Sequence, residues 1–451
     1  MISNPMYDSN KAKKYSLDKL ALLGLFVLSL AVAKLLVVSK SAVRLSSPIE
    51  LPYSGLSLSL PSGNGWQSEL KWRYQQNGFT LKSALAVKQS VFRAHAQCRY
   101  LLAADSRPLP ELFNERESAI EGRATQTGQT KIANLTIDWA RIEKIERSTV
   151  LFFATARLPD NRQLDIDILG SADESGTTEL VFNLMINSIK FTDNNLLHAG
   201  ADIVAQIRQQ GLNAILASTP PYNKNSQLFF LLKDRQERPI GFLMDLFIDT
   251  GESEPLNIRA ADYYYFRDVS PSEQAAFFQA DSRFQKFVWR TETAGRTGTQ
   301  IVADDPCLIT VTRFDRTAEE NVYQLNPAAI PDMLLDLAVI KMLDSGYDKI
   351  ILDVINSDGM VVPTTVTKVR QGQNAVGCDN YPYVLKTEML DGRGYSTLTC
   401  LDDQKQIVRF LLMQEQTYVV ERVAEDDILR LFPERSDFVR HRQELLKQDS
   451  L

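Results

Sequence analysis

Histidine is in short supply in this chain. It has 451 residues and only three histidines, His95, His198 and His441. They fall in different predicted elements, so a histidine-rich metal centre is not available. The sequence also contains no G-x-S-x-G elbow, no G-x-x-x-x-G-K-[ST] phosphate loop and no H-E-x-x-H zinc motif. We therefore expect no catalytic, metal-binding or cofactor-binding residues and no cofactor, and we do not expect an enzyme.

The chain also lacks an excess of positive charge. Lysine and arginine number 50 against 56 acidic residues, which leaves a formal net charge of −6. No basic cluster follows residue 44. A nucleic-acid-binding domain needs a basic patch, so a nucleic-acid partner is excluded.

The four cysteines, at positions 98, 307, 378 and 400, are too few for a disulfide scaffold. Cys378 and Cys400 flank a predicted hairpin through Asp391-Gly-Arg-Gly394 and would face each other across it. In an oxidising compartment they are candidates for a disulfide. The alternative is that both are unpaired and buried, as small hydrophobic residues.

Long apolar runs are scarce too, apart from residues 20–38. A transmembrane helix needs about 20 mostly apolar residues, and this segment qualifies if Lys34, near its end, extends its ammonium group to the interface. The preceding leader, residues 1–19, carries Lys11, Lys13, Lys14 and Lys19. By the positive-inside rule the leader stays in the cytoplasm. The sequence thus predicts a single-pass inner-membrane protein with exported C-terminal domains.

Two alternatives for this segment remain open. It could be a cleaved signal peptide, with Ala31-Val32-Ala33 as the cleavage site. It could also be a buried core helix. The anchor and the signal peptide both export the rest of the chain, to the periplasm or an equivalent space.

Residues 50–192 read as one domain of strands and helices. Residues 51–60 alternate apolar and small polar side chains, and Pro108 and Pro110 open a helix that continues to Glu121. In residues 163–170, Asp165 and Asp167 alternate with apolar residues. The spacing puts both acids on one face of a strand, which allows a catalytic or metal role. A solvated face is the favoured interpretation.

The order of elements in this domain resembles the Mog1/PsbP-like family. The opening strand and turn, Y-S-G-L-S-L-S-L-P-S-G-N-G-W, carry the resemblance, together with a helix in mid-domain, a meander and a closing helix that ends N-S-I-K-F. The resemblance implies an α/β/α sandwich around an antiparallel sheet. It names no catalytic residue, since the family consists mostly of binding or assembly modules.

Residues 193–226 are predicted to form a helical connector and a linker, because Ser218-Thr-Pro-Pro-Tyr cannot extend a helix. Residues 227–451 then show a long series of strand patterns, with a helix predicted over 326–345. The last hairpins, K-Q-I-V-R-F-L-L-M and T-Y-V-V-E-R-V, are similar to those of LolA/RseB-like envelope proteins. That resemblance implies a curved sheet that wraps a helix and binds an apolar ligand.

Aromatic residues gather in the first half of this second domain. Tyr263, Tyr265, Phe284 and Trp289 are candidates for lining a ligand site, because aromatics supply large contact areas in clefts. The favoured alternative is a core lined from both faces of a sheet.

The sequence therefore predicts an α+β protein: an N-terminal transmembrane helix followed by two antiparallel-sheet domains with helices. The predicted function is a membrane-anchored, extracytoplasmic binding or scaffold protein of the cell envelope, non-enzymatic, with an envelope protein or an apolar ligand as its partner. One alternative is a carrier or sensor of an apolar, lipid-like ligand bound in the second domain. The other is a hydrolase with a dispersed site.

Overall fold

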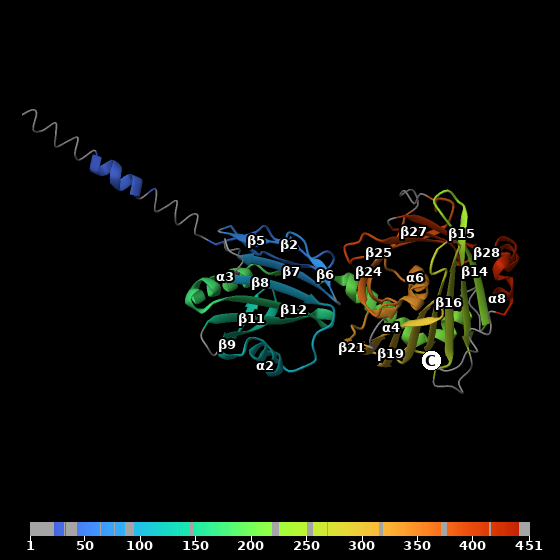
Figure 1. The fold of residues 1–451 in the computed structure, drawn as a ribbon, viewed down its shortest axis with the longest axis horizontal. Coiled ribbons are helices and arrows are strands. Elements are labelled where there is room, and N and C mark those ends of the chain that lie inside the picture. The colour runs from blue at the N-terminus through green and yellow to red at the C-terminus, as the bar shows by residue number, and fades with distance from the viewer. Residues whose placement is uncertain are drawn as a thin grey trace, which may run out of the picture.

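A computed structural model gives the fold (Figure 1). It describes residues 22–30, 32 and 43–441, except for positions 64, 76, 86–93, 133, 145–147, 219–224, 250–255, 268, 315–318, 371–376 and 415. Two sheet-rich regions with helices make up the described chain, as the α+β prediction requires. We call residues 43–191 the first sheet region and residues 225–441 the second sheet region.

The first sheet region is built on an antiparallel sheet of eight strands, in the order β5-β7-β8-β12-β11-β10-β9 with β6 paired to β7. Its strands are β5 (Trp66–Ser68), β6 (Arg73–Gln75), β7 (Gly78–Leu85), β8 (Ala94–Leu101), β9 (Gly122–Ile132), β10 (Leu135–Lys144), β11 (Thr149–Leu158) and β12 (Arg162–Ser171). Short strands flank it: β1 (Arg44–Leu45) with β4 (Pro61–Ser62), and β3 (Leu56–Leu58) between β2 (Ile49–Glu50) and β13 (Lys190–Phe191).

Helices α2 (Leu109–Ile120) and α3 (Ser175–Asn187) cover opposite faces of this sheet. Helix α3 packs Val181, Phe182 and Met185 against one face, while Leu112 of α2 packs against the other. The result is the α/β/α layering that the resemblance implied. The chain turns back between β9 and β10, with Asn134 at positive φ.

The second sheet region has one sheet of 15 strands, in the order β21-β20-β19-β18-β17-β16-β15-β14-β28-β27-β26-β25-β24-β23-β22. All neighbours are antiparallel except β22 and β23. The strands are β14 (Asn225–Lys233), β15 (Pro239–Asp249), β16 (Ile258–Phe266), β17 (Glu273–Ala280), β18 (Phe287–Thr293), β19 (Arg296–Asp305), β20 (Leu308–Arg313), β21 (Glu319–Gln324), β22 (Ala329–Pro331), β23 (Lys349–Ile355), β24 (Val361–Lys368), β25 (Tyr383–Met389), β26 (Ser396–Leu401), β27 (Ile407–Met413) and β28 (Thr417–Val423).

This sheet is strongly curved, and helix α6 (Leu335–Asp344) lies on its concave side (Figure 1). Helices α7 (Glu425–Leu431) and α8 (Ser436–Arg440) cover part of the convex side, where Ile428 and Val439 join the apolar cluster of β14, β15 and β16. The helix predicted over residues 326–345 is shorter than expected. Strand β22 and a 3-10 turn (Asp332–Leu334) take its first half, where Pro331 lacks the N–H group that a continuous helix would use.

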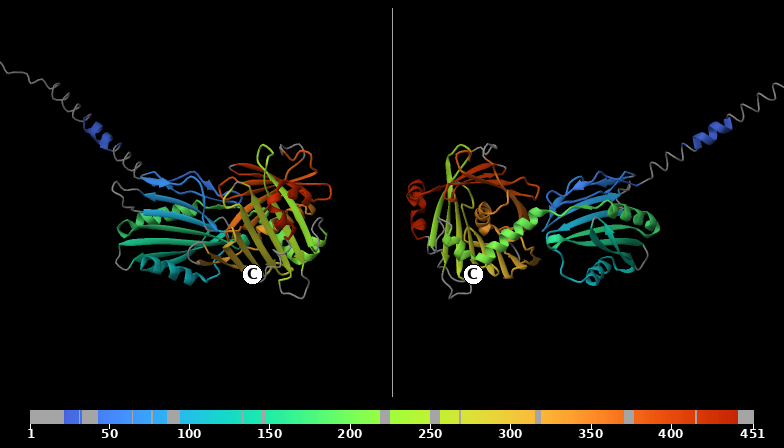
Figure 2. Two further views of the ribbon diagram at one scale, coloured as in Figure 1. Left: turned by 45° about the vertical axis from the view of Figure 1, so that its right-hand side comes forward. Right: turned by 180° about the vertical axis from the view of Figure 1, so that it is seen from behind.

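Helices α4 (Asn195–Gln210) and α5 (Leu212–Ser218) connect the two regions. In the right-hand view of Figure 2, the long green helix runs from the first sheet region along the second. Gly200 lets α4 lie directly on β23, because a Cβ atom at this position would overlap the carbonyl oxygen of Ile351. The connector is therefore part of the packed body. The predicted domain boundaries at 192 and 226 stay predictions, and residues 219–224 of the predicted linker lie outside the described residues.

The two sheet regions meet in a buried junction. Arg162 Nη2 at the start of β12 donates to both carboxylate oxygens of Asp353 on β23, at 3.1 Å each, and the two side chains are 2% and 0% exposed. The Tyr74 hydroxyl donates to the carbonyl oxygen of Val361, and the Val361 N–H donates to Asn77 Oδ1 at 2.7 Å. Removing both members of an ion pair from water costs free energy, and close contacts such as those between Arg162 and Asp353 are needed to offset that cost. The junction fixes the first region against the second.

Residues 22–30 form a helix whose large apolar side chains are 54–70% exposed. In the described part of the chain, no helix is long enough and apolar enough to cross a membrane. The rest of the predicted 20–38 segment, apart from Val32, lies outside the described residues, and so do Lys34, Ala31, Ala33 and the leader.

Candidate functional site

The clearest cluster of charged side chains lies between α2 and the first sheet. It is centred on Asp165 and Asp167 of β12, which we call the β12 acids. The expectation that they face water was wrong: Asp165 is 3% exposed. Arg99 Nη2 of β8 lies 3.2 Å from Asp165 Oδ2 and 3.3 Å from Asp167 Oδ2. The face that carries these acids is covered by α2, so burial forces them to find cationic partners.

Arg116 of α2 completes the cluster from above the sheet. Its guanidinium group lies 3.6 Å from Asp165 and 3.4 Å from Asp167, and its Cζ atom lies 4.8 Å from the centre of the Phe153 ring. Asp165 Oδ1 also accepts hydrogen bonds from Thr155 Oγ1 at 2.8 Å and from Gln163 Nε2 at 2.7 Å. The cluster thus ties α2 to β8, β11 and β12.

These side chains enclose a cavity of about 90 Å³, which we call the α2 cavity. It is lined by Arg99, Leu101, Asp105, Arg107, Leu112, Glu115, Arg116, Phe153, Gln163 and Asp165. At the rim, Arg107 forms ion pairs with Asp105 at 2.5 Å and with Glu115 at 2.8 Å. The exposed fraction of the side chain falls inward, from 46% for Arg107 to 17% for Arg116 and 4% for Asp165, so the cavity has a solvated rim and a buried floor.

Burial also changes the protonation of the β12 acids. Desolvation raises the pKa of Asp167 to about 6, although Arg99 lowers it. Burial likewise raises the pKa of Asp165 against the attraction of Arg99 and its hydrogen bonds. Desolvation lowers the pKa of His95, which lies on the same strand as Arg99. Hence Asp167 changes its charge close to neutral pH, which the sequence pattern did not predict.

Arg99 and Arg116 were missed in the sequence, and a partial signal for Arg99 was present. His95, Gln97 and Arg99 alternate with small or apolar residues in β8, which marks one polar face. In the structure Arg99 is the cross-strand partner of Asp165. Strands β8 and β12 are separated by α2 and three strands in the sequence, so nothing local indicated that these two polar faces adjoin.

A second group of carboxylates lies on the concave side of the curved sheet. Asp245 of β15 and Asp262 of β16 are cross-strand partners, and Asp332 and Asp336 lie at the start of α6. We call these four residues the concave acids. Burial and the negative charge of the other three raise the pKa of Asp262 well above its ordinary value. Burial with the charges of Asp245 and Asp332 raises the pKa of Asp336 to about 7.

The four predicted aromatic residues do not lie together. Tyr263 and Tyr265 pack on the convex side with Phe242, Phe432 and Phe438 beneath α7 and α8. Phe284 and Trp289 belong to the main apolar cluster instead. All four are at most 7% exposed. Neither the α2 cavity nor a smaller cavity of about 20 Å³ at the junction is lined by them, so they form core.

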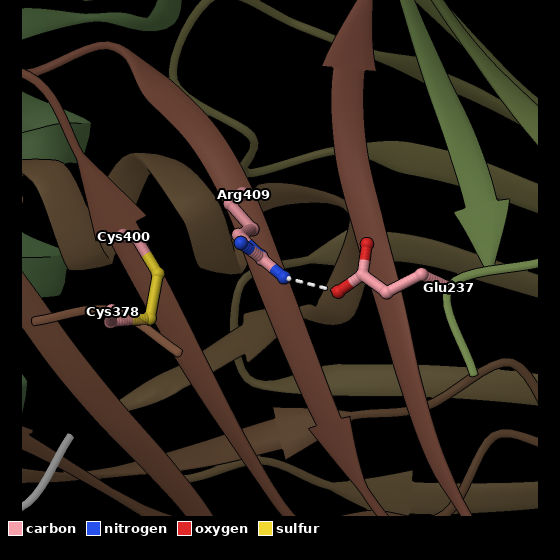
Figure 3. Close-up of a disulfide and its surroundings, with 4 residues drawn as sticks. All are labelled: Glu237, Cys378, Cys400 and Arg409. Carbon is pink, nitrogen blue, oxygen red and sulfur yellow. Dashed lines mark hydrogen bonds and ion pairs between the residues drawn. A yellow bond between two sulfur atoms is a disulfide. The ribbon is translucent and has the colours of Figure 1, made fainter. Parts of the chain in front are cut away.

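The structure joins Cys378 and Cys400 in a disulfide on the convex side of the second sheet region (Figure 3). It adjoins a small apolar cluster with Val384, Leu398 and Leu411. Beside it, Arg409 Nη2 of β27 donates to Glu237 Oε1, in the turn after β14, at 3.2 Å. Of the other cysteines, Cys98 is buried and Cys307 is exposed, and both are free.

The three histidines lie in separate places. His95 is in β8, His198 in α4 contacts Asp193, and His441 follows α8. In the described ranges, no group of three or more His, Cys, Asp or Glu side chains has an arrangement that could hold a metal ion. The α2 cavity combines an open volume with several charged side chains, so it is the candidate site that we consider further.

Comparison with known proteins assigns no family. No family model matches the chain, and no curated protein matches it. Three similar solved structures are a beta-barrel-like protein of the domain of unknown function DUF1849 from Brucella abortus, PsbP (CyanoP) from Synechocystis sp. PCC 6803, and LpqN, involved in cell envelope biogenesis, from Mycobacterium tuberculosis. Their identities are 12%, 8% and 9%, and their TM-scores are 0.31, 0.24 and 0.21.

The matches cover 44%, 34% and 34% of this chain, and 95%, 94% and 94% of the three structures in the same order. At TM-scores this low, the likenesses establish neither family membership nor function.

Proposed function

We propose that this protein is a membrane-anchored, extracytoplasmic binding or scaffold protein of the cell envelope, without enzymatic activity. The observation that carries the proposal is the helix of residues 22–30, whose large apolar side chains are 54–70% exposed. Exposed apolar surface of this extent marks contact with a membrane or another protein. The lysine-bearing leader before it favours the membrane, with the folded body exported.

The buried junction supports a scaffold role. Arg162 and Asp353 hold the two sheet regions in one orientation, so surfaces on both regions keep a fixed distance and angle. A partner that contacts both regions would then bind without the cost of ordering a flexible linker.

The apolar-ligand alternative has less support. Helix α6 lies on the concave side of the curved sheet, and its Leu337, Ala338 and Met342 are buried in the main apolar cluster. Cavities of about 20 and 90 Å³ are both smaller than the several hundred Å³ that ligand pockets usually need. The hydrolase alternative gains no favourable observation, and neither is proposed as a second function.

Fractionation of host cells tests the anchor. The full chain is expected in the membrane fraction, resistant to high salt, with its folded body cleaved by protease added from outside the inner membrane. Substituting Leu25→Arg together with Leu28→Arg should move the protein out of the membrane fraction. The matched control is Leu180→Arg on α3, a leucine of similar exposure (52%) on the folded body.

The anchor is rejected if the unmodified chain is released by salt, or if the mature protein begins at Lys34. The second result would show a cleaved signal peptide. Proximity labelling from the exported side tests the binding role, and a recurring envelope protein is the expected result. The scaffold role would be lost if the purified chain turned over an envelope substrate and one substitution in the α2 cavity abolished that activity.

A further inference from the structure

The α2 cavity holds cationic donors that the surrounding protein does not fully use. Among the described residues, neither Arg99 Nε nor Arg116 Nε has a hydrogen-bond partner, although both atoms are buried. The carboxylates nearest to the Arg116 guanidinium lie 3.4, 3.6 and 3.8 Å away. Hydrogen bonds between N–H and oxygen fall between about 2.7 and 3.2 Å. Arg116 thus lies near these carboxylates but donates no hydrogen bond of normal length to them.

The acidic side chains of the same cavity are, by contrast, occupied. Asp105 accepts from Arg107 Nε at 2.9 Å and from its backbone N–H at 3.0 Å. Asp165 accepts from Arg99, Thr155 and Gln163. Glu115 accepts from Arg107 Nη2 at 2.8 Å. Asp167 Oδ1, deeper in the cluster, is buried without a hydrogen-bond partner among the described residues and lies 3.4 Å from Arg116 Nε. Among the residues that line the cavity, the polar groups left over are N–H donors on cations.

We propose that the α2 cavity binds a small oxyanion, a carboxylate or phosphate group, on the guanidinium groups of Arg116 and Arg99. Guanidinium groups present their donors in a planar fork that fits both kinds of oxyanion. The volume of about 90 Å³ exceeds that needed for a single water molecule and suits a group of a few heavy atoms. Phe153 beneath Arg116 keeps the guanidinium plane in place.

Protonation of Asp167 couples to this binding. An oxyanion near Arg99 and Arg116 repels the β12 acids, and Asp167 already has a pKa of about 6. Taking up a proton at Asp167 removes that repulsion and releases donors of both arginines. The other titratable or charged groups around it are Asp165 on β12, His95 and Arg99 on β8, Glu115 and Arg116 on α2, and Asp105 and Arg107 in the loop before α2. Binding should therefore tighten as the pH falls through about 6.

The inference names a ligand for the proposed binding role and does not depend on the membrane anchor. Isothermal titration calorimetry on the full chain in detergent micelles tests it, with inorganic phosphate, acetate and glycerol 3-phosphate as probes. Sodium chloride at equal ionic strength is the control. Phosphate and acetate test whether a free oxyanion binds. Glycerol 3-phosphate tests whether a phosphate group at the end of a larger molecule binds. We expect a saturable single site for at least one probe.

The matched variants are Arg116→Gln and Arg141→Gln. Arg141 lies on the opposite face of the same sheet, with its Cζ atom 5.8 Å from the Phe152 ring centre and an ion pair to Glu143 at 2.8 Å. We expect Arg116→Gln to weaken binding tenfold or more and Arg141→Gln to change it less than twofold. Should Arg116→Gln fail to fold, Arg99→Gln takes its place, and the pH comparison on the unmodified chain needs no variant.

Acetate is the probe for the pH comparison, because a carboxyl group of ordinary pKa stays ionised from pH 5.5 to 7.5. We expect several-fold tighter binding at pH 5.5, kept in His95→Gln and lost in Asp167→Asn. Absence of saturable heat with all three probes at both pH values would overturn the proposal. Equal losses in Arg116→Gln and Arg141→Gln would also overturn it, since they would indicate a general charge effect. Either result leaves the fractionation test of the anchor untouched.

Discussion

In the first sheet region the β12 acids lie among arginines, whereas in the second the concave acids lie close to one another. Asp165 and Asp167 are flanked by Arg99 and Arg116. Asp262 is flanked by Asp245, and the charges of Asp332 and Asp336 also reach it. Burial raises the pKa values in both places. In the first region Arg99 opposes this rise in pKa, while in the second region like charges and desolvation act in the same direction.

The difference shows that burial alone does not decide what a carboxylate does. With cationic partners it forms a polar site that fastens a helix to a sheet. Where the neighbouring groups are other carboxylates, desolvation and like charge raise its pKa together, and its ionisation opposes folding. The junction between the regions is an intermediate case, with one arginine from the first region and one aspartate from the second.

The largest effect is expected at the junction. Arg162→Ala leaves Asp353 buried without its partner, which costs about 3–5 kcal/mol of stability. Arg162→Met combined with Asp353→Leu should cost less than the single change, because no charge is left buried. Urea unfolding measures both. If the single variant were no less stable than the double, the ion pair would not be what holds the two regions together.

The disulfide comes next. Replacing Cys378 and Cys400 by serine opens a loop with a sequence separation of 22 residues, which should cost roughly 3 kcal/mol under oxidising conditions. Hydrogen exchange should rise around β25 and β26 in the second region and stay unchanged in the first. The prediction fails if mass spectrometry of the unmodified, oxidised protein shows two free thiols at these positions.

A smaller effect is expected from Asp336→Asn, which sharpens the contrast between the two groups of acids. The pKa of Asp336 is raised to about 7, so the folded protein holds a proton that the unfolded chain releases between about pH 4 and 7. Stability is therefore lost as the pH rises through this window. The variant should equal the parent near pH 4 and be about 1–2 kcal/mol more stable at pH 8, given its partial exposure. Thermal unfolding at both pH values measures this. A variant less stable than the parent at pH 8 would contradict the role given to the concave acids.

The smallest effect is expected at the pair beside the disulfide. Glu237 is 57% exposed in its ion pair with Arg409, and solvent screens such pairs. Glu237→Gln should change the free energy of unfolding by about 0.2–1 kcal/mol. If Glu237→Gln lost as much stability as Arg162→Ala, solvent exposure would not explain why the two ion pairs contribute differently to stability.

Local patterns predicted much of the fold. The turn Asp391-Gly-Arg-Gly394 predicted the hairpin of β25 and β26, and Pro108 and Pro110 predicted the start of α2. The failures involve residues distant in sequence. Strand β9 was missed because its polar residues, Gly122 to Ile132, suit an exposed edge that carries no apolar alternation. Asp165 seemed solvated because the sequence does not show that α2 returns to cover that face of the sheet.

The sequence by itself determined the α+β class, the last hairpins and the apolar N-terminal segment, because each depends on side chains close together in the chain. Only the tertiary structure decided that β8 adjoins β12, that α2 brings Arg116 to the β12 acids, and that Arg162 meets Asp353. The physical reason is that a carboxylate's charge and contacts depend on which groups surround it after burial. Those groups come from distant parts of the chain, and no local pattern specifies them.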